Sequence, residues 1–343
     1  MLRRDINDYH FMADAQTGLT MRWGKTLRDD PTWAPVPELA DISISNHCTK
    51  GCSYCYRKSE NNSEFMSLED YCYVLDAINH PTYGNVFQVA IGGGEPLEHP
   101  EFIQIIDETV ARGIVVNFTT NGIHLSADIC LRIQGKVGAV ALSISRMEEL
   151  NTEKIRLLAQ HKIRVNLHYV LSSQNIDEAI KIVQGKYNTI LNGVNAIIFL
   201  TYKPAGRANK NHILKDGAQL AQFISAVNAH KKENVKIGFD ACFIPMLLHS
   251  GFNRPELVDT CEAGLFSVYI DHKLNVSPCS FSGTCDRYNL REYSFYDIWE
   301  EKFSSFRDKQ INQCMDTNCP AHKMCNGCCP YYPEITTCYA NND

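Results

Sequence analysis

The sequence alternates regularly between predicted strands and helices from about residue 40 to residue 232, and this pattern constrains the fold most. Apolar runs with strand character are expected over residues 40–45, 86–91, 114–119, 137–145, 163–171 and 194–202. Helical patterns follow them over 66–79, 100–112, 126–134, 148–161, 175–185 and 213–232. Six such units predict a parallel sheet covered by helices, which right-handed crossovers curve into a partial (β/α)6 TIM-like barrel. Ligand sites in sheets of this kind lie at the carboxyl ends of the strands.

Two segments flank the predicted barrel. Residues 1–38 are polar and contain several prolines, which suggests an arm packed on the body. Beyond about residue 240 the pattern breaks into short cysteine-rich pieces that bury little core of their own. Metal or cluster ligation would compensate for the missing stability of such a core. We therefore predict an α/β protein with an arm over 1–38, a barrel over 39–234 and a small auxiliary domain over 235–343.

Composition excludes several classes of protein. The net charge of −6 gives no global attraction to nucleic acid or to an anionic membrane. No run of 18 apolar residues is present, and the amino terminus lacks the apolar stretch of a signal peptide. We expect a cytoplasmic protein.

The 15 cysteines are unevenly distributed, with three between residues 48 and 55 and nine between 261 and 338. In a reducing compartment such groups indicate metal or cluster ligation rather than disulfides. Cys72 and Cys130 lie on helical patterns and are expected to be small buried hydrophobic residues.

Cys48, Cys52 and Cys55 have the spacing CxxxCxxC directly after the first predicted barrel strand. Three thiolates on one loop can hold three irons of a [4Fe–4S] cube and leave the fourth iron open to a ligand. The alternative is a structural zinc site that lacks one ligand.

The segment IGGGEP, residues 91–96, ends the second strand. Its glycines allow the backbone to approach a ligand closely, and Glu95 can accept a hydrogen bond from a ligand ammonium. With the three-thiol loop one unit earlier and Tyr54 directly before Cys55, the sequence resembles the radical SAM superfamily over about residues 40–232.

That resemblance implies that S-adenosylmethionine binds the open iron and is reductively cleaved to a 5′-deoxyadenosyl radical, which abstracts hydrogen from the substrate. Tyr54 would then lie against the adenine, and Gly93, Gly94 and Glu95 would hold the methionine ammonium. The remaining cofactor contacts are expected from the ends of later strands, at Thr120, Asn121, Ser143, Ser145, Asn166 and His168.

The C-terminal cysteines resemble the SPASM extension of radical SAM enzymes. The resemblance implies one auxiliary [4Fe–4S] cluster on Cys261, Cys279, Cys329 and either Cys285 or Cys242, and a second on Cys314, Cys319, Cys325 and Cys338. Leu274 replaces the usual glycine of the pattern, four residues rather than two separate Cys314 from Cys319, and Cys328 is an additional thiol. One cluster with a zinc-ribbon-like site remains the alternative.

The family resemblance implies a peptide or protein substrate and an electron donor such as flavodoxin or ferredoxin. Two auxiliary clusters favour net oxidation or crosslinking, and Ser280, where sulfatase maturases carry an acid, argues against sulfatase maturation. The candidate catalytic groups are Asp240 and Glu262 as acids or bases and Cys242 as a hydrogen donor. Arg207, in YKPAGRA, could hold a carboxylate or cap a turn. A small-molecule oxidoreductase and a non-catalytic iron–sulfur protein are the alternatives.

Overall fold

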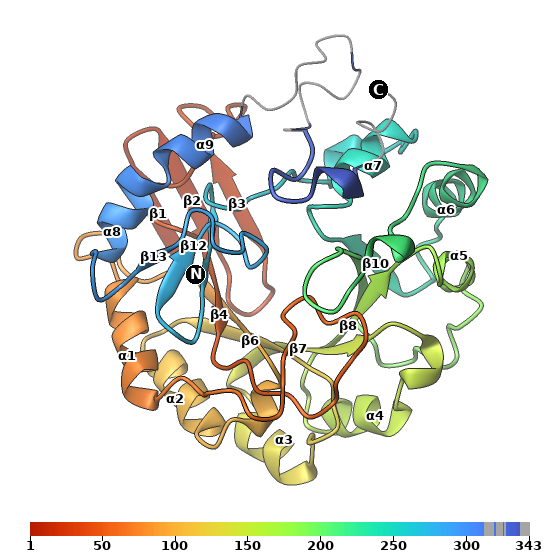
Figure 1. The fold of residues 1–343 in the computed structure, drawn as a ribbon, viewed down its shortest axis with the longest axis horizontal. Helices are drawn as coiled ribbons and strands as arrows, with labels where there is room; N and C mark the ends of the chain where they lie inside the picture. Colours follow the sequence, from red (N-terminus) through yellow and green to blue (C-terminus); the bar gives the residue numbers. More distant parts are fainter. Residues whose placement is uncertain (312–318, 320–324, 326, 337–343) are drawn as a thin grey trace.

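The computed structural model describes residues 1–311, 319, 325 and 327–336, and it contains the six predicted strand–helix units (Figure 1). The strands are β4 (Leu39–Ser43), β5 (Gln88–Gly92), β6 (Val115–Thr120), β7 (Val137–Ile144), β8 (Val165–Leu171) and β9 (Ala196–Thr201). They alternate with α1 (Leu68–Ala77), α2 (Phe102–Ala111), α3 (Ala127–Ile133), α4 (Thr152–Gln160), α5 (Ile176–Val183) and α6 (Ala218–Asn228). Consecutive strands pair in parallel and the helices lie outside them, so the predicted fold class is confirmed.

The sheet continues beyond these six strands. β10 (Lys236–Phe239) pairs in parallel with β9, and β11 (Ser267–Ile270) pairs in parallel with β4. β12 (Asn275–Ser277) and β13 (Tyr288–Asn289) extend the β11 end with antiparallel pairings, which gives ten strands in one sheet. The sheet is therefore continuous across residue 234, where we predicted a domain boundary.

The region after β10 also shares the core of the barrel. Val268 of β11 belongs to the same buried cluster as the barrel strands, as do Trp299 and Phe303 from the helical segment that precedes α9 (Ser304–Ile311). α7 (Ile244–His249) adds Met246, which is fully buried. The short pieces of this region bury their apolar side chains against the barrel rather than in a core of their own, which is why their sequence lacks a long apolar period.

The first 23 residues form a three-stranded antiparallel sheet that the sequence did not predict. Its strands are β1 (Leu2–Ile6), β2 (Tyr9–Ala13) and β3 (Thr20–Trp23). β1 and β2 are joined by the two-residue turn at Asn7, whose φ of 52° is in the left-handed region that asparagine tolerates. Phe11 of β2 is fully buried in a cluster with Phe87 and Phe266, so this sheet packs on the body as the predicted arm would.

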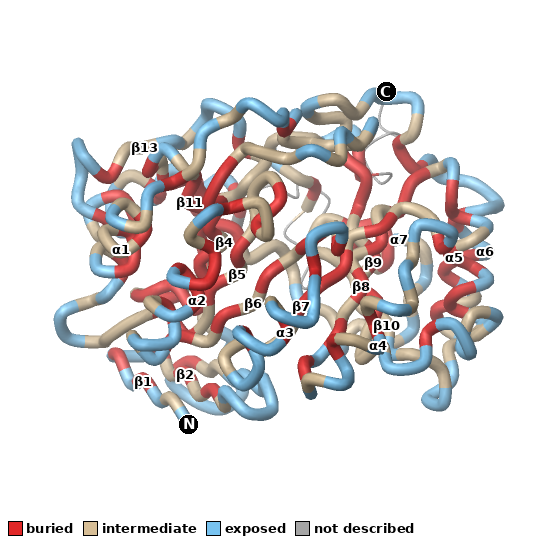
Figure 2. The backbone as a smooth tube through the Cα atoms, turned by 90° about the horizontal axis from the view of Figure 1, so that it is seen from below, coloured by how far each residue is buried: buried red, intermediate tan, exposed pale blue. Residues whose placement is uncertain are grey.

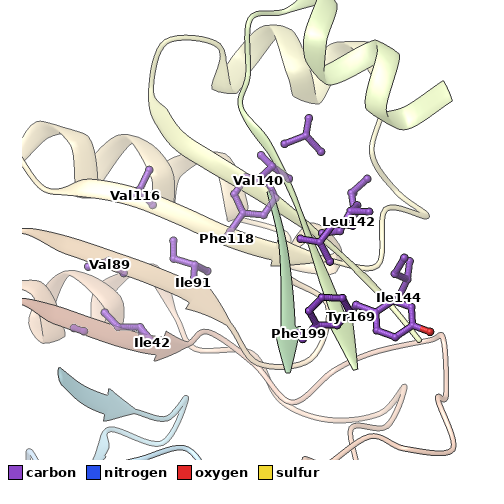
Figure 3. Packing of buried hydrophobic residues seen from close by; sticks show 14 of the residues in the cluster. Ile42, Val89, Ile91, Val116, Phe118, Val140, Leu142, Ile144, Tyr169 and Phe199 are labelled. Atoms are coloured by element: carbon purple, nitrogen blue, oxygen red, sulfur yellow. The ribbon is translucent and has the colours of Figure 1, made fainter. Parts of the chain in front are cut away.

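The barrel strands alternate between apolar and polar faces. Large apolar residues of these strands are fully or nearly fully buried, and Figure 2 shows the strands in the buried interior of the molecule. Figure 3 shows the packing of Ile42, Val89, Ile91, Val116, Phe118, Val140, Leu142, Ile144, Tyr169 and Phe199. Successive side chains of a strand point to opposite faces, so the residues between them lie on the other face, where most are half-buried and several are small or polar. Asn117 Nδ2 donates to Gln88 Oε1 at 3.2 Å, and Thr119 Oγ1 lies 3.2 Å from His168 Nδ1. The barrel thus has an apolar outer layer and a polar inner face.

Candidate active site

The three-thiol segment forms the loop that follows β4, and its thiols on Cys48, Cys52 and Cys55 are half-buried. Arg207 fixes this loop from the segment after β9. Its Nε donates to the carbonyl of Cys52 at 2.8 Å and its Nη1 to the carbonyl of Ser59 at 2.7 Å, while its backbone N–H donates to the carbonyl of Cys55 at 2.9 Å. Arg207 therefore holds the cysteine loop, a role that the sequence analysis did not anticipate.

The glycine turn after β5 lies directly against the same loop. Gly94 donates its N–H to the carbonyl of Ser45 at 2.9 Å, and Glu95 donates to the carbonyl of His47 at 2.7 Å. A side chain on Gly93 would overlap the Ser45 carbonyl and one on Gly94 the His47 carbonyl, and Gly93 also has a φ of 114°. Only glycine fits both positions, so these residues lock the thiol loop to the carboxyl end of the neighbouring strand.

Glu95 is buried and connects the ends of two strands. Its carboxylate accepts hydrogen bonds from Thr120 Oγ1 at 2.5 Å, from the Asn121 N–H at 2.7 Å and from the Leu97 N–H at 3.1 Å. Burial raises the pKa of Glu95, and the hydrogen bond from Thr120 opposes the shift. Because a carboxylate has about four acceptor positions, one remains for the ligand ammonium that the sequence analysis assigned to Glu95.

Tyr54 and Ser145 line one small cavity of about 90 Å³ beside the thiol loop, together with Asn175 and Tyr202. Burial raises the pKa of Tyr54, and the neighbouring Ser145 hydroxyl lowers it. The structure thus brings Tyr54, the residue expected to contact adenine, together with Ser145, one of the predicted contacts from the later strand ends.

The other predicted cofactor contacts occupy different places. Asn121 lines a second cavity of about 490 Å³ with Lys50 and Glu149. Ser143 lies on the inner face, opposite His168 in the pairing of β7 with β8. Asn166 lies at the amino end of β8, where its Oδ1 accepts from Asn195 Nδ2 at 2.8 Å, so the structure does not bring it to the carboxyl end of the sheet.

His168 is neutral in the barrel interior. Burial lowers its pKa to about 4, and the Asp240 carboxylate opposes this shift. It faces Thr119 across the inner face, so its immediate contact is a neutral hydrogen-bonding partner.

A cavity of about 860 Å³ lies between β10 and the β4–β11 side of the sheet and is lined by Asp41, Lys203, Asp240 and Cys279, among others. Lys203 is buried, and its Nζ donates to Asp240 Oδ2 at 2.9 Å. Burial lowers the pKa of Lys203, but the Asp240 carboxylate together with the nearby Cys242 and Cys279 raises it overall, so the ammonium stays charged. Asp240, one of the predicted acid/base groups, is therefore half of a buried ion pair at this cavity.

Glu262, the second predicted acid, also lines this cavity and forms an ion pair with Arg22 of β3. The same guanidinium pairs with Glu38 at 3.0 Å and Asp259 at 2.6 Å, and it lies 3.8 Å from the centre of the Phe266 ring. Glu262 therefore belongs to a charged network that joins the N-terminal sheet to the body.

The sequence analysis missed Asp41, the carboxylate of β4 that lines the cavity. Its carboxylate makes no hydrogen bond or ion pair within the described part of the chain. Burial raises its pKa to about 6, and the guanidinium of Arg57 opposes the shift. An acidic residue inside the apolar strand run ADISIS was the signal that could have identified it.

Several cysteines share a local hydrogen-bond pattern that sequence could not show. In five cases the thiol accepts from the backbone N–H two residues later, namely at Cys48, Cys261, Cys279, Cys325 and Cys329. The bonds to Cys279 and Cys325 measure 3.4 Å from nitrogen to sulfur. Such bonds stabilise thiolates and tune iron–sulfur clusters. All five residues are among the predicted ligands.

Six cysteines line one cavity, namely Cys242, Cys261, Cys279, Cys325, Cys328 and Cys329. Burial raises the pKa of Cys261 to about 11, so this thiol is neutral unless a cation binds it. Among the described residues, no three cysteine, histidine, aspartate or glutamate side chains converge closely enough to hold one metal ion.

The other C-terminal cysteines differ in their exposure to solvent. Cys285 is exposed, Cys319 and Cys325 are half-buried, and the additional thiol of Cys328 is buried. Cys314 and Cys338 lie outside the described residues, so the second predicted ligand set stays a prediction. Leu274 has a φ of 64°, so it adopts the backbone conformation of the glycine that it replaces in the SPASM pattern.

Comparison with known proteins identifies one family model and several proteins that are similar to parts of this chain. Residues 42–197 match the family model described as "Radical SAM superfamily". The "Mycofactocin maturase MftC" of Mycobacterium ulcerans is 30% identical over 86 residues, which cover 25% of this chain and 23% of that protein. The match therefore spans less than a quarter of this relative. The "Tungsten-containing aldehyde ferredoxin oxidoreductase cofactor-modifying protein" of Pyrococcus furiosus is 24% identical over 307 residues, covering 78% of this chain and 82% of that protein.

A solved structure shares the fold. Streptococcus suis SuiB bound to precursor peptide SuiA superposes with a TM-score of 0.68 at 16% identity, over 87% of this chain and 72% of that one. Within the described residues, no helix has the length and apolarity to cross a membrane. The thiol loop and the glycine turn both lie within residues 42–197, the part of the chain that matches the radical SAM superfamily.

Proposed function

We propose that the protein abstracts hydrogen from a peptide or protein substrate, in an oxidative modification or crosslinking reaction, with a [4Fe–4S] cluster on Cys48, Cys52 and Cys55. When bound and reduced, this cluster supplies the electron that cleaves S-adenosylmethionine to a 5′-deoxyadenosyl radical. The backbone lock between Gly94 and the thiol loop carries the proposal, because it places three thiols at the carboxyl ends of the strands, where ligands bind in such sheets.

The residues around the loop fit the cofactor. Tyr54 and Ser145, which line one cavity beside the thiol loop, would contact the adenosine. The backbone of Gly93 and the remaining acceptor position of Glu95 would take the ammonium, and Asn121, next to Lys50, would contribute at the neighbouring cavity. These groups orient the cofactor through hydrogen bonds and contacts, and none of them has to change its charge.

The C-terminal region, residues 235–343, would hold the auxiliary clusters of a SPASM-type extension. The hydrogen bonds from backbone N–H groups to Cys261, Cys279 and Cys329 support ligation, because they would stabilise bound thiolates. The first auxiliary cluster would use these thiols, and the second would use Cys319 and Cys325 with two further thiols. Flavodoxin or ferredoxin would deliver the reducing electrons.

A peptide substrate is supported by the size and chemistry of the interior. The cavity of about 860 Å³ lies at the high end of the range for ligand sites, and residues of β10 line it. Its Lys203–Asp240 pair and the free carboxylate of Asp41 offer polar contacts to a peptide backbone or side chain. The names of two compared proteins, a maturase and an enzyme bound to a precursor peptide, point in the same direction.

A small-molecule substrate is the second candidate. It is favoured by the Pyrococcus furiosus relative, whose name describes modification of a cofactor and whose match extends over most of this chain. A non-catalytic iron–sulfur protein would need neither the glycine lock nor the cofactor cavities.

The test is iron content together with 5′-deoxyadenosine formation after anaerobic reconstitution and reduction with S-adenosylmethionine present. Three cubes predict roughly 12 irons per chain. The Cys48/Cys52/Cys55→Ala variant should retain about 8 irons and form no 5′-deoxyadenosine. Iron without cofactor cleavage under several reductants would contradict the proposal.

A further inference from the structure

The turn that follows β10 fixes the orientation of one thiol. Its first residue, Asp240, is held by Thr201 Oγ1 at 2.6 Å and by Lys203 Nζ at 2.9 Å. Phe243, at the other end of the turn, donates its N–H to the carbonyl of Asp240 at 3.0 Å and is fully buried. Between these two anchors, Cys242 lines both the interior cavity and the adjoining cavity of the thiols.

Five other cysteines line the second of these cavities with Cys242, and three of them, Cys261, Cys279 and Cys329, interact with its thiol. The thiols of Cys242 and Cys329 form a hydrogen bond, and Cys261 and Cys279 are near enough to interact electrostatically with Cys242. The four come from distant parts of the chain, so only the fold brings them together. Lys203 places a buried positive charge beside Cys242 and Cys279, which would offset part of the negative charge of bound thiolates.

This arrangement suits a cube better than a single ion. A zinc ion needs its sulfurs to converge at about 2.3 Å from one point, whereas a [4Fe–4S] cube takes one thiolate at each of four irons. The four interacting thiols are among the six that line a cavity, and no three of the described ligand-type side chains converge on a common point.

Cys285, the other candidate from the sequence, lies away from this arrangement. It is exposed and lines neither cavity. Two successive turns separate it from Cys279, since Ser282 donates to the carbonyl of Cys279 at 3.1 Å and Cys285 donates to the carbonyl of Ser282 at 3.0 Å.

We propose that Cys242 is the fourth protein ligand of an auxiliary [4Fe–4S] cluster that also uses Cys261, Cys279 and Cys329, and that Cys285 is not a ligand. The inference rests on the proposed function, because it presupposes an auxiliary cluster in this region. It assigns Cys242 to ligation, so this thiol is not the hydrogen donor that the sequence analysis considered.

The test uses the full chain with Cys48, Cys52 and Cys55 changed to alanine, so that all bound iron belongs to auxiliary sites. In this background, Cys242→Ala should remove between about one and four irons per chain and change the EPR spectrum of the reduced protein, because one iron of the cube loses its thiolate. Cys242→Ser should retain more iron with a shifted spectrum, since a serine oxygen can replace the sulfur. Cys285→Ala should leave iron and spectrum unchanged, as should Cys72→Ala on α1, which serves as the matched control.

Unchanged iron and EPR in Cys242→Ala, or losses in Cys285→Ala instead, would overturn the assignment. A general folding defect would appear alike in the gel filtration and circular dichroism of Cys242→Ala and Cys242→Ser, and it would overturn the assignment. Loss of iron in Cys72→Ala as well would also overturn the assignment. Absence of iron from the background chain would overturn the auxiliary clusters themselves. Formation of 5′-deoxyadenosine by the unmodified chain tests the radical chemistry separately.

Discussion

Gly94 approaches His47 so closely that a methyl group on Gly94 would overlap the His47 carbonyl. Gly94→Ala should therefore separate the glycine turn from the thiol loop and prevent the SAM-binding cluster from assembling, with a loss of about four irons per chain. The measurement is iron and sulfide content after reconstitution. Gly92→Ala is the matched control, because its new methyl group would have only Asp41 Oδ1 at 4.0 Å. Equal iron in both variants would contradict the role of Gly94.

Arg207 offers a second way to loosen the same loop. Its guanidinium donates to the carbonyls of Cys52 and Ser59, and a lysine cannot make both bonds because it lacks the planar fork. Charge-assisted hydrogen bonds contribute about 1.5–3 kcal/mol each, so both Arg207→Lys and Arg207→Ala should release the cluster faster. The rate of iron transfer to a chelator measures this, with the exposed Arg132→Ala on α3 as control. If the Arg207 variants release iron as slowly as Arg132→Ala, Arg207 does not hold the loop.

The sequence predicted the barrel and the thiol loop because both depend on local pattern. The six strand–helix units follow from periodicity, and the Cys48 loop and Gly94 turn lie at strand ends that could be placed from the chain order. The pairing of β11 with β4 joins segments more than 200 residues apart and could not be predicted, because β11 is only 4 residues long.

Long-range contacts within the site could not be predicted from the sequence either. The contact between Cys242 and Cys329 and the hydrogen bonds from Arg207 to the loop depend on tertiary structure and have no local signal. Asp41 did carry a signal, a charge within an apolar strand, which the sequence analysis did not use. The residues that lie beside Asp41 on the inner face come from other strands, so they could be identified only from the structure.

Lys203 should tune the auxiliary cluster. Its ammonium lies beside Cys242 and Cys279 and 4.3 Å from the centre of the Phe281 ring. Lys203→Gln removes a positive charge, so the reduction potential of the cluster should fall, whereas Lys203→Arg should keep it close to that of the unmodified chain. An EPR-monitored redox titration measures both. An unchanged potential in Lys203→Gln, or an equal fall in Lys203→Arg, would contradict this role.

Asp41 should make stability depend on pH. Because its pKa is raised from 3.8 to about 6 in the folded protein, the folded state binds the proton more tightly than the unfolded state. The resulting stabilisation is complete below about pH 4 and is lost as the pH rises through 6. Asp41→Asn should thus raise the free energy of unfolding at pH 8 relative to pH 4, by at most about 3 kcal/mol for a shift of roughly two units.

Thermal unfolding of the reconstituted protein under anaerobic conditions checks the Asp41 prediction. The melting temperatures of Asp41→Asn and the unmodified chain should converge at low pH and diverge at pH 8. Asp216→Asn, which changes an exposed carboxylate, should show no such divergence. A parallel pH dependence of Asp41→Asn and the unmodified chain would mean that Asp41 is not the titrating group.

The central claim is that Cys48, Cys52 and Cys55 leave one iron open for S-adenosylmethionine. The most direct measurement is electron–nuclear double resonance on the reduced protein with S-adenosylmethionine labelled with ¹⁵N at the methionine amino group. We predict a ¹⁵N coupling to the cluster that is absent from the Cys48/Cys52/Cys55→Ala variant. A reduced cluster on the intact loop without any ¹⁵N coupling would contradict the account.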